Sequence, residues 1–158
     1  GYAIVDFLDR DELQIIRDFI QAKLPPSDLE ATDISFSAGT LELSYRQAIT
    51  KQVKKIFSQK LIELLPEHRV LLCNLVRKKP DSLHSEMPLH QDPSLTDEAV
   101  SKSYGVWCPL IDVDEHNGCL QVVQQSHLLN SHIRPFFTFE GFPYSQEILA
   151  LMQQHLTS

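Results

Sequence analysis

The sequence has few cysteines, few basic residues and no long apolar run, and each shortage excludes a class of protein. It contains 3 cysteines, none in Cys-x-x-Cys spacing, which indicates reduced core thiols rather than disulfide or zinc chemistry. Its 14 basic against 21 acidic residues give a net charge of −7, which argues against a dedicated nucleic-acid surface. No apolar run approaches the roughly 18 residues of a membrane span, and the first residues lack the charged n-region and apolar h-region that are typical of a secretory leader. We therefore expect a cytoplasmic protein that binds neither nucleic acid nor membranes, and small-molecule substrates stay open.

The apolar residues that are present suffice for a core. With 158 residues, 42% of them hydrophobic, the chain suits one domain over residues 1–158. Asp9 and Glu12 have the spacing of a capping box, which predicts a helix that begins there. Pro25 lacks a backbone N–H donor, so we expect the helix to end before it.

Helical and strand patterns follow one another in the rest of the chain. Residues 49–64 keep helical apolar spacing, whereas residues 27–42 are polar and predict a loop. Asn117-Gly118 predicts a hairpin turn, because these residues tolerate a positive φ. Short β-rich runs predict strands at residues 2–7, 70–76, 104–112 and 120–123.

The motif His90-Gln91-Asp92 is the main candidate for chemistry. In an extended chain, side chains two residues apart leave the same face, so His90 and Asp92 converge while Gln91 points away. An imidazole and a carboxylate form two thirds of the 2-His-1-carboxylate set that leaves positions open on non-heme Fe(II). The motif alone is not specific, because a surface loop can hold the same residues and His84-Ser85-Glu86 has a similar pattern.

Further blocks downstream give the motif a context. His90-Gln91-Asp92 is followed by Trp107-x-Pro109-Leu110-x-Asp112, by Asn117-Gly118-x-Leu120-x-Val122-Val123 and by Ser126-His127. In order and spacing these blocks resemble the core of the phytanoyl-CoA dioxygenase family. The resemblance covers roughly residues 87–127, and it is more specific than any one of the blocks.

The resemblance implies both a fold and an activity. The fold is mainly β with flanking helices (α+β), a double-stranded β-helix, also called a jelly roll, of the cupin-like type. The activity is that of an Fe(II)- and 2-oxoglutarate-dependent dioxygenase that uses O₂ to hydroxylate a small organic or acyl substrate. By matched position, His90 and Asp92 would be the catalytic metal ligands, and Ser126-His127 would lie near the site entrance.

Cofactor contacts are expected from three further residues. Lys78 or Lys79 could bind a carboxylate of 2-oxoglutarate, because a compact ammonium suits that role. Trp107 belongs to a matched block, and we expect it to contribute to the cofactor site and to pack in the core. Substitution of Trp107 by alanine would then cost about 3–5 kcal/mol.

Part of the family pattern has no match. The second histidine ligand and the arginine for 2-oxoglutarate are absent from the sequence, so we expect the 158 residues to be the front part of a longer jelly-roll domain. His132 and His155 are candidates for a third ligand, although neither lies in a matching motif. Residues 128–144 form an aromatic insert, and the pattern from Ser145 predicts a last helix.

Two alternatives stay open. A catalytically silent jelly-roll binding module would keep Trp107 and Asn117-Gly118 without holding iron. A cupin-like hydrolase or isomerase would use another divalent metal, and its activity would not depend on 2-oxoglutarate. The substrate and the oligomeric state have no readable code in the sequence.

Overall fold

The computed structural model describes residues 1–82, 84–87, 89–128, 133, 134 and 150. The chain divides into two compact units. One unit is built from Gly1–Val5, Met87–Pro109 and Val113–Ser158, and the other from Asp6–Glu86 and Leu110–Asp112. That residues 1–158 form one domain stays a prediction.

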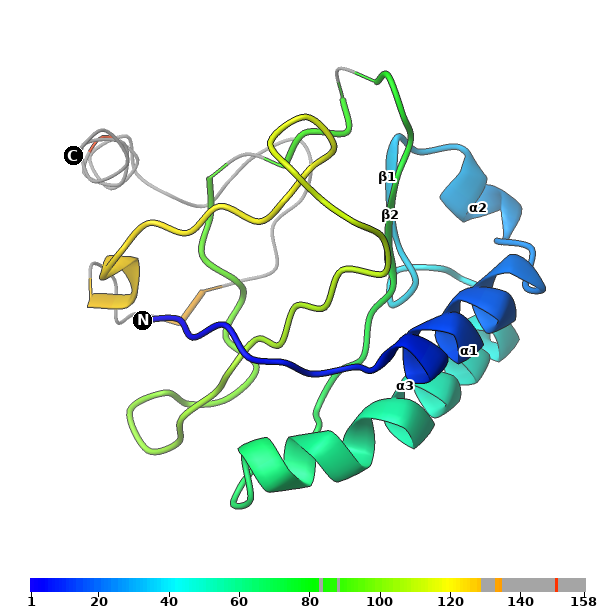
Figure 1. Cartoon of the computed structure of the whole chain (residues 1–158). Coiled ribbons are helices and arrows are strands. Elements are labelled where there is room, and N and C mark those ends of the chain that lie inside the picture. Colours follow the sequence, from blue (N-terminus) through cyan, green and yellow to red (C-terminus); the bar gives the residue numbers. More distant parts are fainter. Residues whose placement is uncertain (83, 88, 129–132, 135–149, 151–158) are drawn as a thin grey trace. The chain divides into compact units, whose positions relative to one another are not determined.

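Three helices belong to the second unit: α1 (Arg10–Gln21), α2 (Ser27–Glu30) and α3 (Leu43–Leu64) (Figure 1). Helices α1 and α3 pack against each other, and each contributes a deeply buried isoleucine. Ile16 of α1 is 2% exposed and Ile49 of α3 is 1% exposed. Among the described residues, no helix is both long and apolar enough to cross a lipid bilayer.

The N-terminus of α1 is fixed by the predicted capping box. The Glu12 amide donates to Asp9 Oδ1 at 2.9 Å, and the Asp9 amide donates to Glu12 Oε2 at 2.9 Å. Lys60 of α3 also reaches Glu12, with 2.9 Å between Nζ and Oε2. The cap therefore sets where α1 begins, and the ion pair links it to α3.

A small antiparallel sheet lies partly where a loop was predicted. Strand β1 (Ile34–Phe36) pairs with β2 (Val76–Lys78), with Ile34 opposite Lys78. The loop prediction for residues 27–42 was therefore wrong at β1 and at α2. Ile34 is 4% exposed. Its strand partner, β2, is distant in the sequence, so no local pattern reveals the pairing.

The other strand predictions are not matched by ladders. In the described part of the chain, residues 2–7, 70–75, 104–112 and 120–123 form no paired strands. The turn predicted at Asn117-Gly118 is present: the Cys119 amide donates to the Asp114 carbonyl at 3.0 Å, and Gly118 has φ 92°. The predicted turn therefore forms, but among the described residues the two flanking strands of the predicted hairpin do not.

Trp107 is not in a core, because 48% of it is exposed. This corrects the prediction that it packs inside the protein. The physical reason is that the segment around it pairs with no strand among the described residues, so no ladder covers its side chains. The structure shows helices with a small antiparallel sheet, the coarser part of the expected fold class. The aromatic insert and the last helix predicted after it lie almost wholly outside the described residues.

Candidate metal centre

The chain around His90 and Asp92 is shaped by the proline that follows. A residue before proline is held in the extended region, because the pyrrolidine ring clashes with a helical neighbour. Pro93 therefore favours an extended Asp92, the conformation in which alternate side chains share a face. His90 Nε2 lies 3.5 Å from Asp92 Oδ1, whereas Gln91 reaches away and donates from Nε2 to the Ser126 carbonyl at 2.7 Å.

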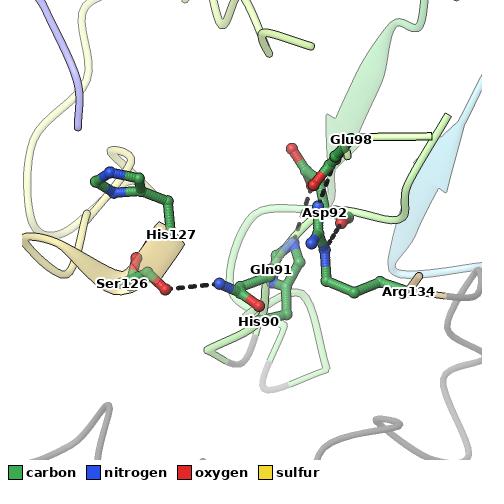
Figure 2. Close-up of a pocket in the computed structure, with 7 residues that line it drawn as sticks. All are labelled: His90, Gln91, Asp92, Glu98, Ser126, His127 and Arg134. Carbon is green, nitrogen blue, oxygen red and sulfur yellow. Dashed lines mark hydrogen bonds and ion pairs between the residues drawn. The ribbon is translucent and has the colours of Figure 1, made fainter. Parts of the chain in front are cut away.

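These residues line a cavity of about 220 Å³ in the first unit (Figure 2). The His90 side chain is 21% exposed and the Asp92 side chain 80% exposed. The walls are completed by side chains that come from three stretches of sequence. The residues that line the cavity are His90, Gln91, Asp92, Glu98, Ser126, His127 and Arg134.

The electrostatics favour an ionised Asp92. The hydrogen bond and charge of His90, together with the charge of Arg134, hold the pKa of the Asp92 carboxyl below its ordinary value, against the opposing effect of partial desolvation by the surrounding atoms. The cavity thus presents one carboxylate beside one imidazole, a hard oxygen donor and a nitrogen donor.

The spacing of the two donor atoms is close to what a shared divalent ion requires. Two ligands each about 2.1 Å from one ion and about a right angle apart are separated by about 3.0 Å. The His90 Nε2 to Asp92 Oδ1 distance of 3.5 Å is close to this value. At 3.5 Å the contact is longer than the usual N–H···O hydrogen bond of about 2.7–3.2 Å, so His90 and Asp92 make a weak one.

Two donors do not complete a ligand set. Among the described residues, no group of three or more His, Cys, Asp or Glu side chains could hold a metal ion. His127 lines the same cavity as His90, but it is not part of such a group. His132 and His155 lie outside the described residues.

The remaining predicted site residues lie elsewhere. Lys78 and Lys79 belong to the second unit, where they line a separate pocket and Lys79 Nζ lies 3.6 Å from Asp33 Oδ1. Trp107 belongs to the first unit but is not among the residues that line the His90 cavity.

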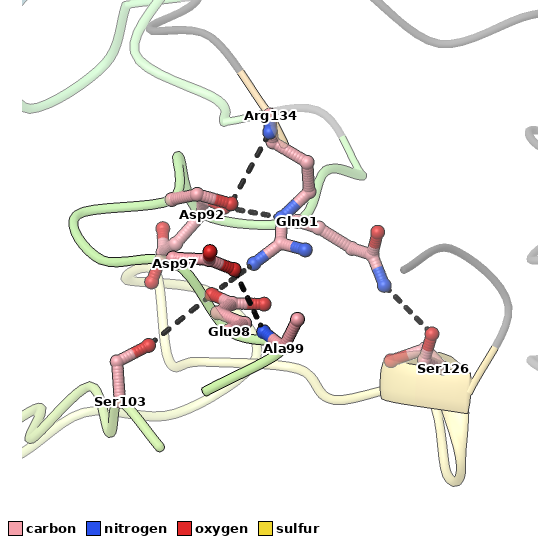
Figure 3. Close-up of polar contacts among 9 residues, drawn as sticks. Gln91, Asp92, Asp97, Glu98, Ala99, Ser103, Ser126 and Arg134 are labelled. Carbon is pink, nitrogen blue, oxygen red and sulfur yellow. Dashed lines mark hydrogen bonds and ion pairs between the residues drawn. The ribbon is translucent and has the colours of Figure 1, made fainter. Parts of the chain in front are cut away.

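The sequence interpretation missed Arg134 and Glu98. Arg134 Nη2 donates to Glu98 Oε1 at 2.7 Å, and Arg134 Nε donates to the Asp92 carbonyl at 2.8 Å (Figure 3). No local pattern links residues 36 and 42 positions apart. The one sequence feature that could have drawn attention to Arg134 is that it is the last arginine of the sequence.

The comparison with protein families confirms the resemblance. A family model described as phytanoyl-CoA dioxygenase matches residues 1–150. No curated protein and no solved structure matches the chain. The chain belongs to the phytanoyl-CoA dioxygenase family, a family of oxygenases whose members use Fe(II) and 2-oxoglutarate.

Proposed function

We propose that the protein is an Fe(II)/2-oxoglutarate-dependent dioxygenase that hydroxylates a small organic or acyl substrate, on a jelly-roll fold. The observation that carries the proposal is the pair of donor atoms at 3.5 Å, His90 Nε2 and Asp92 Oδ1, in a cavity of a member of this family. Family membership supplies the reaction class. The donor pair supplies the place in the chain where the metal would bind.

His90 and Asp92 would hold the iron and are the proposed catalytic residues. His90 offers a neutral nitrogen and Asp92 a negative oxygen, which together reduce the positive charge on the ion and leave coordination positions open. When bound, Fe(II) and 2-oxoglutarate would supply the oxidation. The substrate C–H group would become an alcohol with one oxygen atom of O₂, and the other oxygen atom would enter succinate as 2-oxoglutarate is converted to succinate and CO₂.

The other side chains of the cavity would shape the site. Gln91 is tied to the Ser126 carbonyl, which holds the backbone between the two ligands. Gly105 lies close to the site, because a Cβ atom on it would be 3.5 Å from Asp92 Oδ2. A larger residue at this position would occupy space beside the Asp92 carboxylate, so Gly105 helps to keep the cavity open.

The roles of Lys78, Lys79 and Trp107 in cofactor binding remain part of the proposal. Lys78 is exposed at the end of β2, and a lysine ammonium suits a carboxylate of 2-oxoglutarate. Lys79 is already paired with Asp33. Lys78 is therefore the better candidate of the two lysines.

Anaerobic spectroscopy tests the proposal. Addition of Fe(II) and 2-oxoglutarate to the full-length protein should give the weak visible charge-transfer band of the bound chelate. Calorimetry should show 2-oxoglutarate binding that needs the metal. A folded protein with neither signal would refute the enzyme and favour a silent binding module. Activity with another divalent metal and no requirement for 2-oxoglutarate would favour a cupin-like hydrolase or isomerase.

A further inference from the structure

We propose that Arg134 is a positioning residue for the candidate metal centre. Its guanidinium holds the chain that follows Asp92 and so directs the Asp92 carboxylate toward His90. The inference deepens the proposed function and rests on it. It goes further because Arg134 touches the backbone and an acidic partner, and acts on the metal through Asp92.

Four hydrogen bonds join Arg134 to the segment 92–98, and Figure 3 shows Arg134 beside Asp92 and Glu98. Arg134 Nε donates to the Asp92 carbonyl at 2.8 Å and Nη2 donates to Glu98 Oε1 at 2.7 Å. The Ser94 amide donates to the Arg134 carbonyl at 3.0 Å, and the Arg134 amide donates to Ser94 Oγ at 3.2 Å. Both ends of the segment are therefore held by one residue.

These contacts replace those of a missing strand ladder. Among the described residues, the segment that carries Asp92 pairs with no strand. Pro93 lacks an N–H donor, so it cannot fix the backbone by its own hydrogen bond. Because the Asp92 side chain is 80% exposed, packing does not hold it either. The bonds from Arg134, and the hydrogen bond from Gln91 to the Ser126 carbonyl, are contacts that orient this segment.

Burial and charge distinguish positioning from cofactor binding. The Arg134 side chain is only 13% exposed and the Glu98 side chain 31% exposed, so the ion pair is shielded from water. Glu98 is held in turn by Ser103, whose Oγ donates to Glu98 Oε1 at 3.2 Å. The charge of Arg134 is thus already neutralised and two of its three nitrogens are engaged, which favours a structural clamp over the capture of an anionic ligand.

Metal affinity measures the effect directly, with Co(II) as the probe in the full-length protein and no 2-oxoglutarate present. We expect Arg134→Met to raise the dissociation constant of Co(II) about 10- to 100-fold, as is typical when a partner of a metal ligand is lost. Arg69→Met is the matched control, because Arg69 is exposed and has no hydrogen bond or ion pair among the described residues. In the metal-free protein, the Ser94 amide should exchange with deuterium faster in Arg134→Met than in the control.

Arg134→Lys is the second variant, and it should bind Co(II) with an affinity between those of the wild type and Arg134→Met. A single ammonium keeps the charge beside Glu98 but cannot reproduce both bonds of the guanidinium fork. If Arg134→Met does not fold, equal Co(II) affinity in Arg134→Lys and the wild type overturns the inference.

Two other results separate the inference from the proposed function. Equal Co(II) affinity in Arg134→Met and Arg69→Met, or a loss confined to 2-oxoglutarate binding, overturns the positioning role alone. A wild-type protein that binds no Co(II) overturns the proposed function itself.

Discussion

Replacing Asp92 with asparagine should separate metal binding from folding. The change removes one negative charge and keeps the size of the side chain, so the backbone can stay extended before Pro93. We expect a large loss of metal affinity together with a small loss of stability, because the Asp92 side chain is 80% exposed.

The two magnitudes follow from the geometry of the site. A single negative charge about 2.1 Å from a divalent ion contributes about 4 kcal/mol even at a dielectric constant of about 80. That energy corresponds to about a thousandfold in the dissociation constant. By contrast, an ion pair whose carboxylate is exposed, as that of Asp92 is, contributes no more than about 1 kcal/mol to folding. Its loss would lower Tm by about 2–4 °C in a chain of this size.

Co(II) titration and thermal unfolding check the prediction. Asp97→Asn is the matched control, since Asp97 is exposed in the same loop and asparagine still accepts the hydrogen bond from the Ala99 amide. If Asp92→Asn and Asp97→Asn bind Co(II) equally well, the assignment of Asp92 as a ligand is refuted. A fall in Tm far beyond the expected range would show that Asp92 serves the fold instead.

Three further predictions concern the second unit. Ile49→Ala should lower the free energy of unfolding by about 2–5 kcal/mol, whereas Ile62→Ala in the same helix should change it by about 0.5 kcal/mol or less. Ile49 is 1% exposed and Ile62 58%, so equal effects in urea unfolding would contradict the packing described. Hydrogen bonds from the Leu41 amide and Thr40 lower the pKa of Asp28 from 3.8. The stability that Asp28 contributes is therefore present above pH 3.8 and lost as pH falls through the lowered pKa; an Asp28→Ala penalty that stays the same in acid would oppose this. Burial raises the pKa of the Cys73 thiol above 9.0. At neutral pH, iodoacetamide should therefore modify Cys73 more slowly in the folded protein than in the urea-unfolded protein. Equal rates would contradict the burial of Cys73.

The helical part of the second unit was predictable because its signals are local. Asp9 and Glu12 are three positions apart, and their reciprocal hydrogen bonds need only the first turn of α1. The sequence cannot show where a distant partner lies. Strand β1 therefore escaped prediction, since Ile34–Phe36 becomes a strand only by pairing with Val76–Lys78.

The candidate site divides in the same way. The two-residue spacing of His90 and Asp92 was enough to predict that their side chains converge, because alternation is a property of any extended chain. The order of the motifs was enough to predict the family, which the family match over residues 1–150 confirms. That His90 and Asp92 hold iron stays a prediction.

What the sequence by itself determined is therefore short-range: the cap of α1, the turn at Gly118 and the shared face of His90 and Asp92. Tertiary structure alone brought Arg134 to the Asp92 carbonyl and to Glu98, across 42 and 36 residues. Local hydrogen bonds depend on neighbours within about one turn of chain, whereas a long-range contact depends on which loops close and on what their closure buries. Residue types and spacing therefore pointed to the two donor atoms but not to the arginine that holds the chain beside them.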